Sequence, residues 1–474
     1  MNADISQLFP WVVIKFGGTS VSNRHCWQNI TAIIKSHLAK GKRVLVVCSA
    51  PSGVSNLLEK LLQKAIEGDI AEILRVIREK YIALTEQLGI DCRNYLSDQF
   101  NKLENLVEGI RLVDEVTPRV QARVMAYGEF LLTHIGSEYL KQQSIQVRWQ
   151  DVREWLSTEK HPDFRHPDAY LSGRCSSEVD INLQKTLQAV SESVVITQGF
   201  IAQNERGETV LLGRGGSDSS ATYLAAKIRA ECCEIWTDVP GIYTANPKQI
   251  PQARLIRRLN YDEAQELALM GAKVLHPKCI APVSRQKIPL FVRYTPEPER
   301  LGTEIFDNEA SNISQIKSVL TKHDIILISI ETVQMWHQVG FLADVFQCFK
   351  KQGISIDLIS TSESSVTVSL DKNANSKESH VLDALLAELN YFAKAFVIAP
   401  CASVSLVGRN IRAILPQLGS VFSVFKEQKI HLVSQAANDL NLTFVVDEEQ
   451  AQHLASKLHH LLIEQRHAEN AFIF

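Results

Sequence analysis

Apolar residues follow two different patterns in the first 300 residues of the chain. Continuous apolar runs at 12–16 and 43–50 predict strands buried on both faces, because a half-exposed strand would alternate. Between these runs, apolar positions recur with a helical period from about Asn23 to Ala39. A strand, a helix and a second buried strand predict a parallel βαβ unit, in which ligands bind beyond the carboxyl ends of the strands.

Further strands and helices are predicted up to about residue 295. Amphipathic helix is predicted at 57–113, 119–142, 221–230 and 261–276, and strands at 145–152, 194–202, 209–212, 233–237 and 290–295. We expect the run at 290–295 to be the last strand of the domain. The polar stretch 297–314 is then expected to be a domain boundary.

An internal repeat follows this boundary. Residues 345–354 resemble residues 421–430, and the similarity continues without a gap, 76 residues apart, as far as Asp371 and Asp447. Each copy is predicted to contain a helix, a strand, a turn and a strand, which indicates two copies of a small α+β domain. Because only the first copy concentrates acids at 356–363, we expect it to bind a cationic ligand and the second copy mainly to dimerise.

The composition is that of an ordinary globular protein and argues against several classes. Lys plus Arg (50) nearly equals Asp plus Glu (53), so no nucleic-acid surface is expected. The nine cysteines form no Cys-x-x-Cys motif, so neither zinc nor a disulfide framework is expected, and a reducing cytoplasm fits. No apolar run approaches 18 residues and residues 1–10 lack the regions of a signal peptide, so we expect no membrane span and no secretion.

The first candidate site lies at the end of the run at 12–16, which carries one lysine. Lys15 stands just before Gly17 and Gly18, and an apparent helix follows. Glycines let the backbone approach a ligand closely, and the N–H groups at a helix start favour an anion. A lysine here can act as a point charge on phosphate oxygens. A strand followed by Gly-Gly is also an ordinary tight turn, and this segment alone does not decide between the two interpretations.

A second glycine-rich loop, residues 213–216, leads into the helix predicted at 221–230. Arg214 in this loop can bind a carboxylate through two parallel N–H bonds. Asp218 has two interpretations, because an acid at a helix start is commonly a cap worth about 1 kcal/mol. Two such loops at strand–helix junctions make capping alone an incomplete account.

A third segment has the residues expected around a nucleoside. The strand predicted at 233–237 ends at Thr237-Asp238, and a Pro-Gly turn follows. Tyr243 and Lys248 come next and supply an aromatic ring and a cation. Polar groups suit the ribose and base, the ring can pack against the base, and the cation suits a phosphate.

Two charged residues within predicted helices have a simple local explanation. Glu129 follows a glycine inside the helix predicted at 119–142, and the local pattern favours an exposed glutamate. Lys273 stands near the end of the helix predicted at 261–276, where a lysine complements the helix dipole. The local sequence around each residue therefore does not assign it to a binding or catalytic site.

Six motifs occur in order between residues 11 and 305. They are Lys15–Val21, Ser49 with Ser55-Asn56, Gly128-Glu129, Gly213–Asp218, Thr237–Thr244 and Gly271–Pro277. Their order and spacing resemble the aspartate kinases of the amino-acid-kinase superfamily, and the repeat resembles that family's paired ACT domains. The resemblance implies an α/β, three-layer αβα fold with a mostly parallel central sheet in residues 1–310. It also implies two ferredoxin-like α+β ACT domains in residues 311–474.

The activity that the resemblance implies is phosphoryl transfer from MgATP to the side-chain carboxylate of L-aspartate. The products would be 4-phospho-L-aspartate and ADP, in the first step of lysine, threonine, methionine and diaminopimelate biosynthesis. No protein ligands for the metal are implied, since Mg²⁺ is commonly held by phosphate oxygens and water.

The resemblance also implies the roles of individual residues. Lys15 would stabilise the transferred phosphoryl group, and Asp218 would organise the catalytic lysines. Aspartate would be bound by Ser49, Ser55, Glu129 and Arg214. The nucleotide would contact Lys15, Gly17, Gly18, Ser20, Thr237, Asp238, Tyr243, Lys248 and Lys273. The family often has threonine in place of Ser55 and arginine in place of Lys248, which keeps the hydrogen-bonding or charge type.

Feedback control by an amino acid is a further implication. Lysine-inhibited members carry an acid and a Thr-Ser-Glu sequence in the first ACT copy, as Asp357 and residues 361–363 do here. We therefore expect lysine rather than threonine as the inhibitor. The residues implied to lie near it are Met335, Phe341, Asp357, Ser362 and Glu363.

Assembly and gene organisation are also suggested by the resemblance. ACT domains usually pair, so a homodimer through these domains is expected, and a tetramer is left open. Trp11–Lys15 and Ser22–His25 also resemble the kinase parts of fusions with diaminopimelate decarboxylase. We expect this chain to correspond to the kinase part of such an arrangement.

Other functions are weighed against this one. A related kinase acting on acetylglutamate, glutamate or a nucleoside monophosphate would share the glycine loops, but the paired ACT domains with Glu129 and Arg214 favour aspartate. A catalytically silent amino-acid sensor would keep the ACT pair, and the intact Lys15, Arg214 and Asp218 argue against it. An NAD dehydrogenase would need Gly-x-Gly-x-x-Gly after a strand and an acid about 20 residues on, which the sequence lacks.

Overall fold

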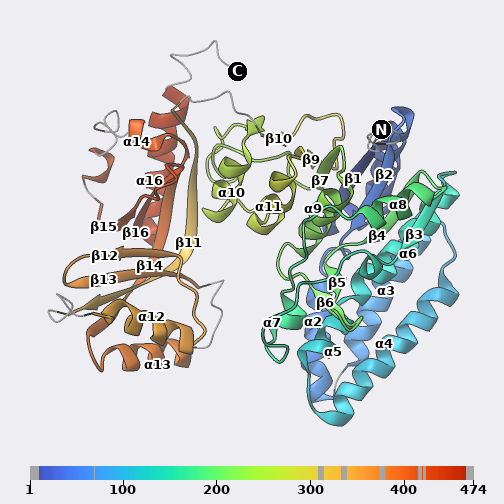
Figure 1. The fold of residues 1–474 in the computed structure, drawn as a ribbon, viewed down its shortest axis with the longest axis horizontal. Helices are drawn as coiled ribbons and strands as arrows, with labels where there is room; N and C mark the ends of the chain where they lie inside the picture. The colour runs from blue at the N-terminus through green and yellow to red at the C-terminus, as the bar shows by residue number, and fades with distance from the viewer. Residues whose placement is uncertain are drawn as a thin grey trace. The chain divides into compact units, whose positions relative to one another are not determined.

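The computed structural model describes residues 10–68, 70–307, 314–332, 339–372, 379–414, 419, 423–426 and 428–465. Its chain divides into two compact units (Figure 1). Unit 1 comprises Met1–Ile242, Arg257–Ala264 and Lys273–Asn308. Unit 2 comprises Tyr243–Ile256, Gln265–Ala272 and Glu309–Phe474.

A central sheet forms the core of unit 1. Among the described residues its strand order is β3-β4-β2-β1-β7-β9-β10-β8, and every neighbouring pair is parallel except β9–β10. The strands are β1 (Trp11–Phe16), β2 (Arg43–Cys48), β3 (Val147–Gln150), β4 (Val194–Gln198), β7 (Cys232–Thr237), β8 (Arg258–Leu259), β9 (Leu290–Tyr294) and β10 (Thr303–Ile305). The prediction of a mostly parallel sheet is confirmed.

The edge of this sheet differs from the prediction. The run at 290–295 was expected to be the last strand, but β10 follows it and pairs antiparallel with β9. β8 then pairs with β10 and extends the sheet further. The expectation is wrong because β10 and β8 contain only three and two residues, too few to show a hydrophobic pattern.

Helices cover the sheet, and several begin where the sequence supplies a cap. Asn23 accepts a hydrogen bond from the Cys26 N–H at the start of α1, and Thr117 followed by Pro118 starts α5. The helices up to residue 300 are α1 (Arg24–Ala39), α2 (Val54–Glu67), α3 (Ala71–Leu88), α4 (Arg93–Val113), α5 (Pro118–Met125), α6 (Tyr127–Gln142), α7 (Asp168–Leu171), α8 (Ile181–Ala189), α9 (Gly216–Ile228), α10 (Tyr261–Leu269) and α11 (Ile280–Arg285). The helical stretch at 57–113 is therefore three helices, of which α3 and α4 lie side by side (Figure 1).

The helix predicted from about Asn23 to Ala39 is confirmed as α1, and a short 3-10 helix, Gly18–Val21, lies between it and the glycine loop after β1. Two local predictions are corrected. The helix predicted at 221–230 begins five residues earlier, at Gly216, because its first turn consists of small residues that resemble a loop in the sequence. The helix predicted at 261–276 ends at Leu269, just before Gly271, so Lys273 lies in a turn beyond it. Short strands β5 (Ile201–Gln203) and β6 (Thr209–Leu211) form a separate hairpin.

Unit 2 is built around an antiparallel sheet. In the part of the chain that is described, the strand order is β12-β13-β11-β14-β16-β15. The strands are β11 (Gln315–Glu331), β12 (Leu358–Thr361), β13 (Ser365–Asp371), β14 (Lys394–Arg409), β15 (Ile430–Ser434) and β16 (Asn441–Asp447). The helices are α12 (Phe341–Lys351), α13 (Ser379–Leu389), α14 (Ile411–Ile414) and α16 (Glu448–His459).

The strand register confirms the internal repeat. Ile325 of β11 pairs with Asp371 of β13, and Cys401 of β14 pairs with Asp447 of β16. Both residues of the second pair lie 76 residues after those of the first. In the described part of the segment that corresponds to α12, Ser423–Phe425 form a 3-10 helix. Each copy has its own hydrophobic core, and both contribute to one sheet.

Candidate active site

Lys15 and Asp218 form a buried ion pair in unit 1. Lys15 lies in β1, and Asp218 lies in the first turn of α9, so the two residues come from elements far apart in the sequence. The Lys15 Nζ lies 2.5 Å from the Asp218 Oδ1, and the two side chains are only 10% and 13% exposed. A buried charge needs such a partner, because burial without one is costly.

The geometry excludes capping as the role of Asp218. The N-cap of α9 is Gly215, in the left-handed conformation with φ of 68°, and no side chain caps this helix. A Cβ at Gly215 would also clash with the His276 side chain. The glycine loop therefore turns tightly against His276 and places Asp218 toward Lys15. Arg214 in the same loop is exposed.

The loops after β1 and β2 are in direct contact. The Ser52 N–H donates to the Gly18 carbonyl over 3.1 Å, and the Ser49 N–H donates to the Phe16 carbonyl over 3.1 Å. A Cβ on Gly18 would lie 2.7 Å from the Ala50 carbonyl oxygen, so this approach requires glycine. The carboxyl ends of β1 and β2 thus form one rim, as the βαβ pattern predicts.

Glu129 is buried behind this rim, at the start of α6. Its Oε1 accepts a hydrogen bond from the Ala50 N–H at 3.0 Å, and its buried Oε2 has no partner among the described residues. Burial raises the pKa of this carboxyl to about 8, and the Ala50 hydrogen bond opposes that rise. The local pattern favoured an exposed glutamate, and this interpretation is wrong. A buried carboxyl with a free oxygen is suited to a cationic group of a ligand.

The remaining predicted residues of unit 1 are more dispersed. Thr237 ends β7 and its hydroxyl donates to Asp238 Oδ1 over 3.2 Å. The Ser20 hydroxyl lies 2.7 Å from the Thr295 Oγ1, so its contact is with the end of β9. Ser55 is half-buried in the first turn of α2, and Lys273 is exposed.

Tyr243 and Lys248 belong to unit 2. They lie on the segment Tyr243–Ile256, where Tyr243 forms a β-bridge with Leu255 and Lys248 is exposed. The chain passes from unit 1 to unit 2 just after Ile242, so the predicted nucleotide residues are distributed over both units.

His276 is a residue of the site that the sequence reasoning missed. It packs on Gly215, and burial followed by the nearby Lys278 and Arg214 lowers the pKa of its imidazole, while Asp218 acts in the opposite sense. The sequence could have indicated His276 as a site residue, because His276 lies in the Gly271–Pro277 motif.

The predicted effector residues lie in the first repeat copy, except that Met335 is outside the described residues. Phe341 is buried at the start of α12, and Ser362 and Glu363 are exposed. Asp357 Oδ2 binds the Lys322 ammonium at 3.0 Å, and the same ammonium lies 3.1 Å from Asp371 Oδ2. The two carboxylates raise the pKa of Lys322, although its burial opposes the rise. The acid expected to meet a cationic ligand thus already has a cationic partner.

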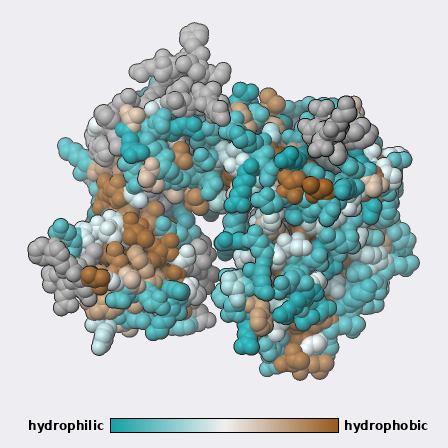
Figure 2. Space-filling view, in the orientation of Figure 1, coloured by the Kyte–Doolittle hydropathy of each residue, from teal (hydrophilic) through white to brown (hydrophobic). Residues whose placement is uncertain are grey.

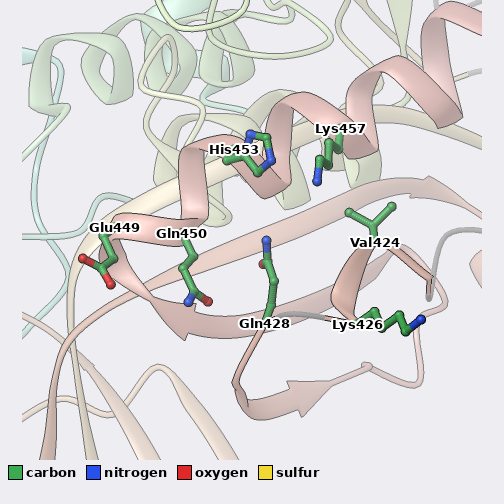
Figure 3. A pocket seen from close by; sticks show the side chains of 7 residues that line it. All are labelled: Val424, Lys426, Gln428, Glu449, Gln450, His453 and Lys457. Carbon is green, nitrogen blue, oxygen red and sulfur yellow. The ribbon is translucent and has the colours of Figure 1, made fainter.

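A cavity of 680 Å³ lies in the second repeat copy (Figure 3). Side chains from α16 and from the segment before β15 point into it. It is lined by Val424, Lys426, Gln428, Glu449, Gln450, His453 and Lys457. None of these residues was predicted to bind a ligand, and the cavity is separate from the Lys15–Asp218 pair, which lies in unit 1.

The described residues contain neither a cluster of metal-ligating side chains nor a helix that could cross a membrane. No three His, Cys, Asp or Glu side chains in the described ranges gather as metal ligands would. Within the same ranges, no helix has the length and apolar character needed to cross a bilayer.

Comparison with known proteins gives consistent family matches. The sequence profile of the amino acid kinase family matches residues 10–294, and that of an ACT domain matches residues 328–376. Lysine-sensitive aspartokinase 3 of Escherichia coli is 33% identical, over 96% of this chain and 99% of the relative. Aspartokinase 1, chloroplastic, of Arabidopsis thaliana is 30% identical, over 95% of this chain and 80% of the relative.

Solved structures match over nearly the whole chain. The crystal structure of E. coli aspartokinase III in complex with aspartate and ADP (R-state) has a TM-score of 0.81 at 33% identity, and covers 95% of this chain and 99% of its own. The complex of that enzyme with lysine and aspartate (T-state) has a TM-score of 0.75 with the same coverage. The predicted fold of an amino-acid-kinase sheet followed by ACT-type domains is thereby confirmed.

Proposed function

This chain belongs to the amino acid kinase family and, within it, to the aspartokinases, and from that premise we propose how its residues transfer phosphate from ATP to L-aspartate. The observation that carries the proposal is the Lys15–Asp218 ion pair at the rim formed by the β1 and β2 loops. Residues 1–310 would form the catalytic domain and residues 311–474 the regulatory region.

The chemistry requires positioning and charge neutralisation rather than a base. The nucleophile is a carboxylate with a reference pKa of about 3.9, so it is already ionised at neutral pH. Lys15 would stabilise the charge on the transferred phosphoryl group, which spreads over its oxygens in the transition state. Asp218 holds the Lys15 ammonium at 2.5 Å and would keep it oriented before the substrate arrives.

Aspartate would be bound by residues at the same rim. Glu129 would accept the substrate ammonium on its unpartnered Oε2, and Arg214 would bind a carboxylate. Ser49 and Ser55 would add hydrogen bonds from the β2 loop and the start of α2. A dicarboxylic amino acid matches this combination of one buried acid and one exposed guanidinium.

The nucleotide would contact Gly17, Gly18, Ser20, Thr237, Asp238, Tyr243, Lys248 and Lys273. Mg²⁺ would arrive with ATP and neutralise phosphate charge, held mainly by phosphate oxygens and water. Asp218, the acid nearest to Lys15, is already engaged by its ammonium, which fits a metal held by phosphate oxygens and water rather than by this carboxylate. We propose no protein ligand for the metal.

Regulation by lysine would act through the first repeat copy. One of the matching structures is a complex of E. coli aspartokinase III with lysine and aspartate. In this chain Asp357 would bind the effector's cation with help from Phe341, Met335, Ser362 and Glu363. An incoming lysine would compete with Lys322 for Asp357.

A second copy of the chain would pack on unit 2. Figure 2 shows apolar side chains gathered over the part of this unit that contains the sheet. Exposed apolar residues on its strands include Ile359 on the edge strand β12 and Val433 on the edge strand β15. Apolar edge strands tend to pair with another chain, so a homodimer through the ACT-type copies is proposed.

A coupled assay of ADP release tests the proposed function. We expect ADP release from MgATP with L-aspartate and little with L-glutamate or N-acetyl-L-glutamate. Equal turnover with acetylglutamate would favour the related kinase, and binding of lysine without any turnover would favour the silent sensor.

A further inference from the structure

The segment Tyr243–Ile256 is part of the C-terminal core although it lies well before the repeat in the sequence. Ala245 and Ile250 are buried in the same hydrophobic cluster as Leu454 and Leu458 of α16. The backbone is held as well, because the Val319 N–H donates to the Thr244 carbonyl over 2.8 Å. This segment carries Tyr243 and Lys248, which are proposed to contact the nucleotide.

A chain of polar side chains fixes the segment to the end of α16. Thr244 Oγ1 lies 2.9 Å from the His459 Nε2, and His459 Nδ1 lies 2.7 Å from Glu464 Oε1. His459 is fully buried and Thr244 is 8% exposed. Glu464 lies on the π-helical turn His460–Glu464 that continues α16, and its other oxygen contacts His460.

Thr244 also makes a hydrogen bond within its own segment. Thr244 Oγ1 accepts the Arg254 N–H at 2.9 Å, so its own proton is available to His459. Both ring nitrogens of the buried His459 imidazole therefore have a partner, Nε2 in Thr244 and Nδ1 in Glu464. A buried polar network requires such partners.

The arrangement of hydroxyl, imidazole and carboxylate resembles a hydrolase triad, but its burial argues against catalysis. A nucleophile must reach its substrate, and both Thr244 and His459 are enclosed by the core of unit 2. The network instead ties two distant parts of the sequence together, 215 residues apart.

We propose that the Thr244–His459–Glu464 chain positions the segment Tyr243–Ile256 for nucleotide binding, so that the C-terminal helix α16 sets the affinity for ATP. His459 and Thr244 are therefore positioning residues for the phosphoryl donor. Gln452 supports the same segment, since its Nε2 donates to the Gln249 carbonyl over 3.2 Å. The inference rests on the proposed function, because it takes Tyr243 and Lys248 as nucleotide residues.

The test compares variants of the full chain that keep the shape but remove the hydrogen bonds. His459→Leu and Thr244→Val should raise the KM for ATP about five- to tenfold, because each leaves a buried polar partner unpaired and loosens the segment. The KM for aspartate should change by less than about twofold. His459→Gln and Thr244→Ser keep a hydrogen-bonding group and should restore the KM for ATP to within about twofold of wild type.

A core substitution elsewhere in unit 2 supplies the control. Val368→Ala removes buried volume in the first repeat copy, outside the cluster that contains Ala245, and should lower the melting temperature without changing the KM for ATP. A purely structural role for His459 would raise both Michaelis constants alike or leave both unchanged, and either result overturns the proposal.

Binding of MgADP by calorimetry separates this inference from the proposed function. If the wild type releases no ADP with aspartate, the proposed function fails, but the Kd for MgADP still compares wild type with His459→Leu. We expect a five- to tenfold weaker Kd in the variant. An equal Kd, or no binding by wild type, overturns the inference.

Discussion

Lys15 and Asp218 show how one ion pair can prepare a site for phosphoryl transfer. Each charge would be expensive to bury alone, and together they leave a cation fixed at the rim of the β1 and β2 loops. Glu129 is prepared differently, because it is buried with one oxygen unpartnered and a raised pKa. At the residue scale the site therefore combines a paired cation, Lys15, with an acid, Glu129, that has one oxygen left for a ligand.

Removing the Lys15 cation tests this account. Lys15→Ala should lower kcat by about 10²- to 10³-fold, the usual loss when one group that stabilises transition-state charge is removed. Asp218→Asn should lower kcat less, because the ammonium remains but loses its anionic partner. Lys42→Ala, which removes a lysine paired with Glu231 outside the site, is the matched control and should leave kcat unchanged. A Lys15→Ala enzyme with wild-type kcat would contradict the assignment. Steady-state kinetics of ADP release is the measurement.

The pH dependence of aspartate binding tests Glu129. Its pKa of about 8 means that the carboxyl is mostly neutral at pH 6 and mostly ionised above pH 8. Since an ammonium binds the ionised form, the KM for aspartate should fall as pH rises, by up to about tenfold per unit below pH 8, and then level off. Glu129→Gln should raise the KM and flatten this profile. Wild-type KM values that are constant from pH 6 to 8.5 would refute the role.

At the scale of elements, the site depends on how closely loops approach one another. Gly18 brings the β1 loop against the Ala50 carbonyl, and Gly215 turns the second glycine loop against His276. The first repeat copy also contains a cluster of charged side chains, in which the Lys322 ammonium lies between the carboxylates of Asp357 and Asp371. The contacts of the glycine loops and the Lys322 cluster each join segments that are distant in the sequence.

Gly18→Ala should separate the two loops, because its Cβ would meet the Ala50 carbonyl oxygen at 2.7 Å. We expect a loss of activity of at least about tenfold with a lower melting temperature. Gly109→Ala is the matched control, since nothing lies within 4 Å of its Cβ and alanine favours the interior of α4. This control should stabilise the protein by about 0.5–1 kcal/mol and keep full activity. Equal activity in the two variants would contradict the close approach.

Inhibition by lysine tests the cluster around Lys322. Asp357→Asn should raise the lysine concentration needed for half-inhibition about tenfold, because it removes a charge partner. Lys322→Met should lower that concentration, since it frees Asp357 for the effector. Lys394→Met, at an exposed lysine of the same unit, should change nothing. The measurement is ADP release titrated with lysine and, separately, with threonine. Inhibition by threonine alone would refute the effector assignment.

At the scale of the whole molecule, the sequence predicts the cores well and the long-range contacts poorly. β1, β2 and β4 are apolar runs, and the strand, turn and strand predicted in each repeat copy correspond to the antiparallel pairs β12–β13 and β15–β16. β8 and β10 are too short to be recognised. No spacing rule joins Lys15 to Asp218 or Thr244 to His459, because such contacts arise only when distant elements pack.

The residues of the candidate site were predicted mainly from the resemblance to a known family. Local patterns left Asp218 as a possible cap and favoured an exposed Glu129, and the structure excludes both interpretations. The family motifs named these two residues as site members because motif order carries information that local periodicity lacks. The roles assigned to them stay predictions.

Trapping the product with hydroxylamine tests the central claim most directly. An acyl phosphate on the aspartate side chain reacts with hydroxylamine to give aspartyl β-hydroxamate, which mass spectrometry identifies. The full chain with MgATP and L-aspartate should form this hydroxamate, and Lys15→Ala should form it at least about 100-fold more slowly. Absence of the hydroxamate with the wild type, or equal rates in the two proteins, would contradict phosphoryl transfer to aspartate at the Lys15–Asp218 site.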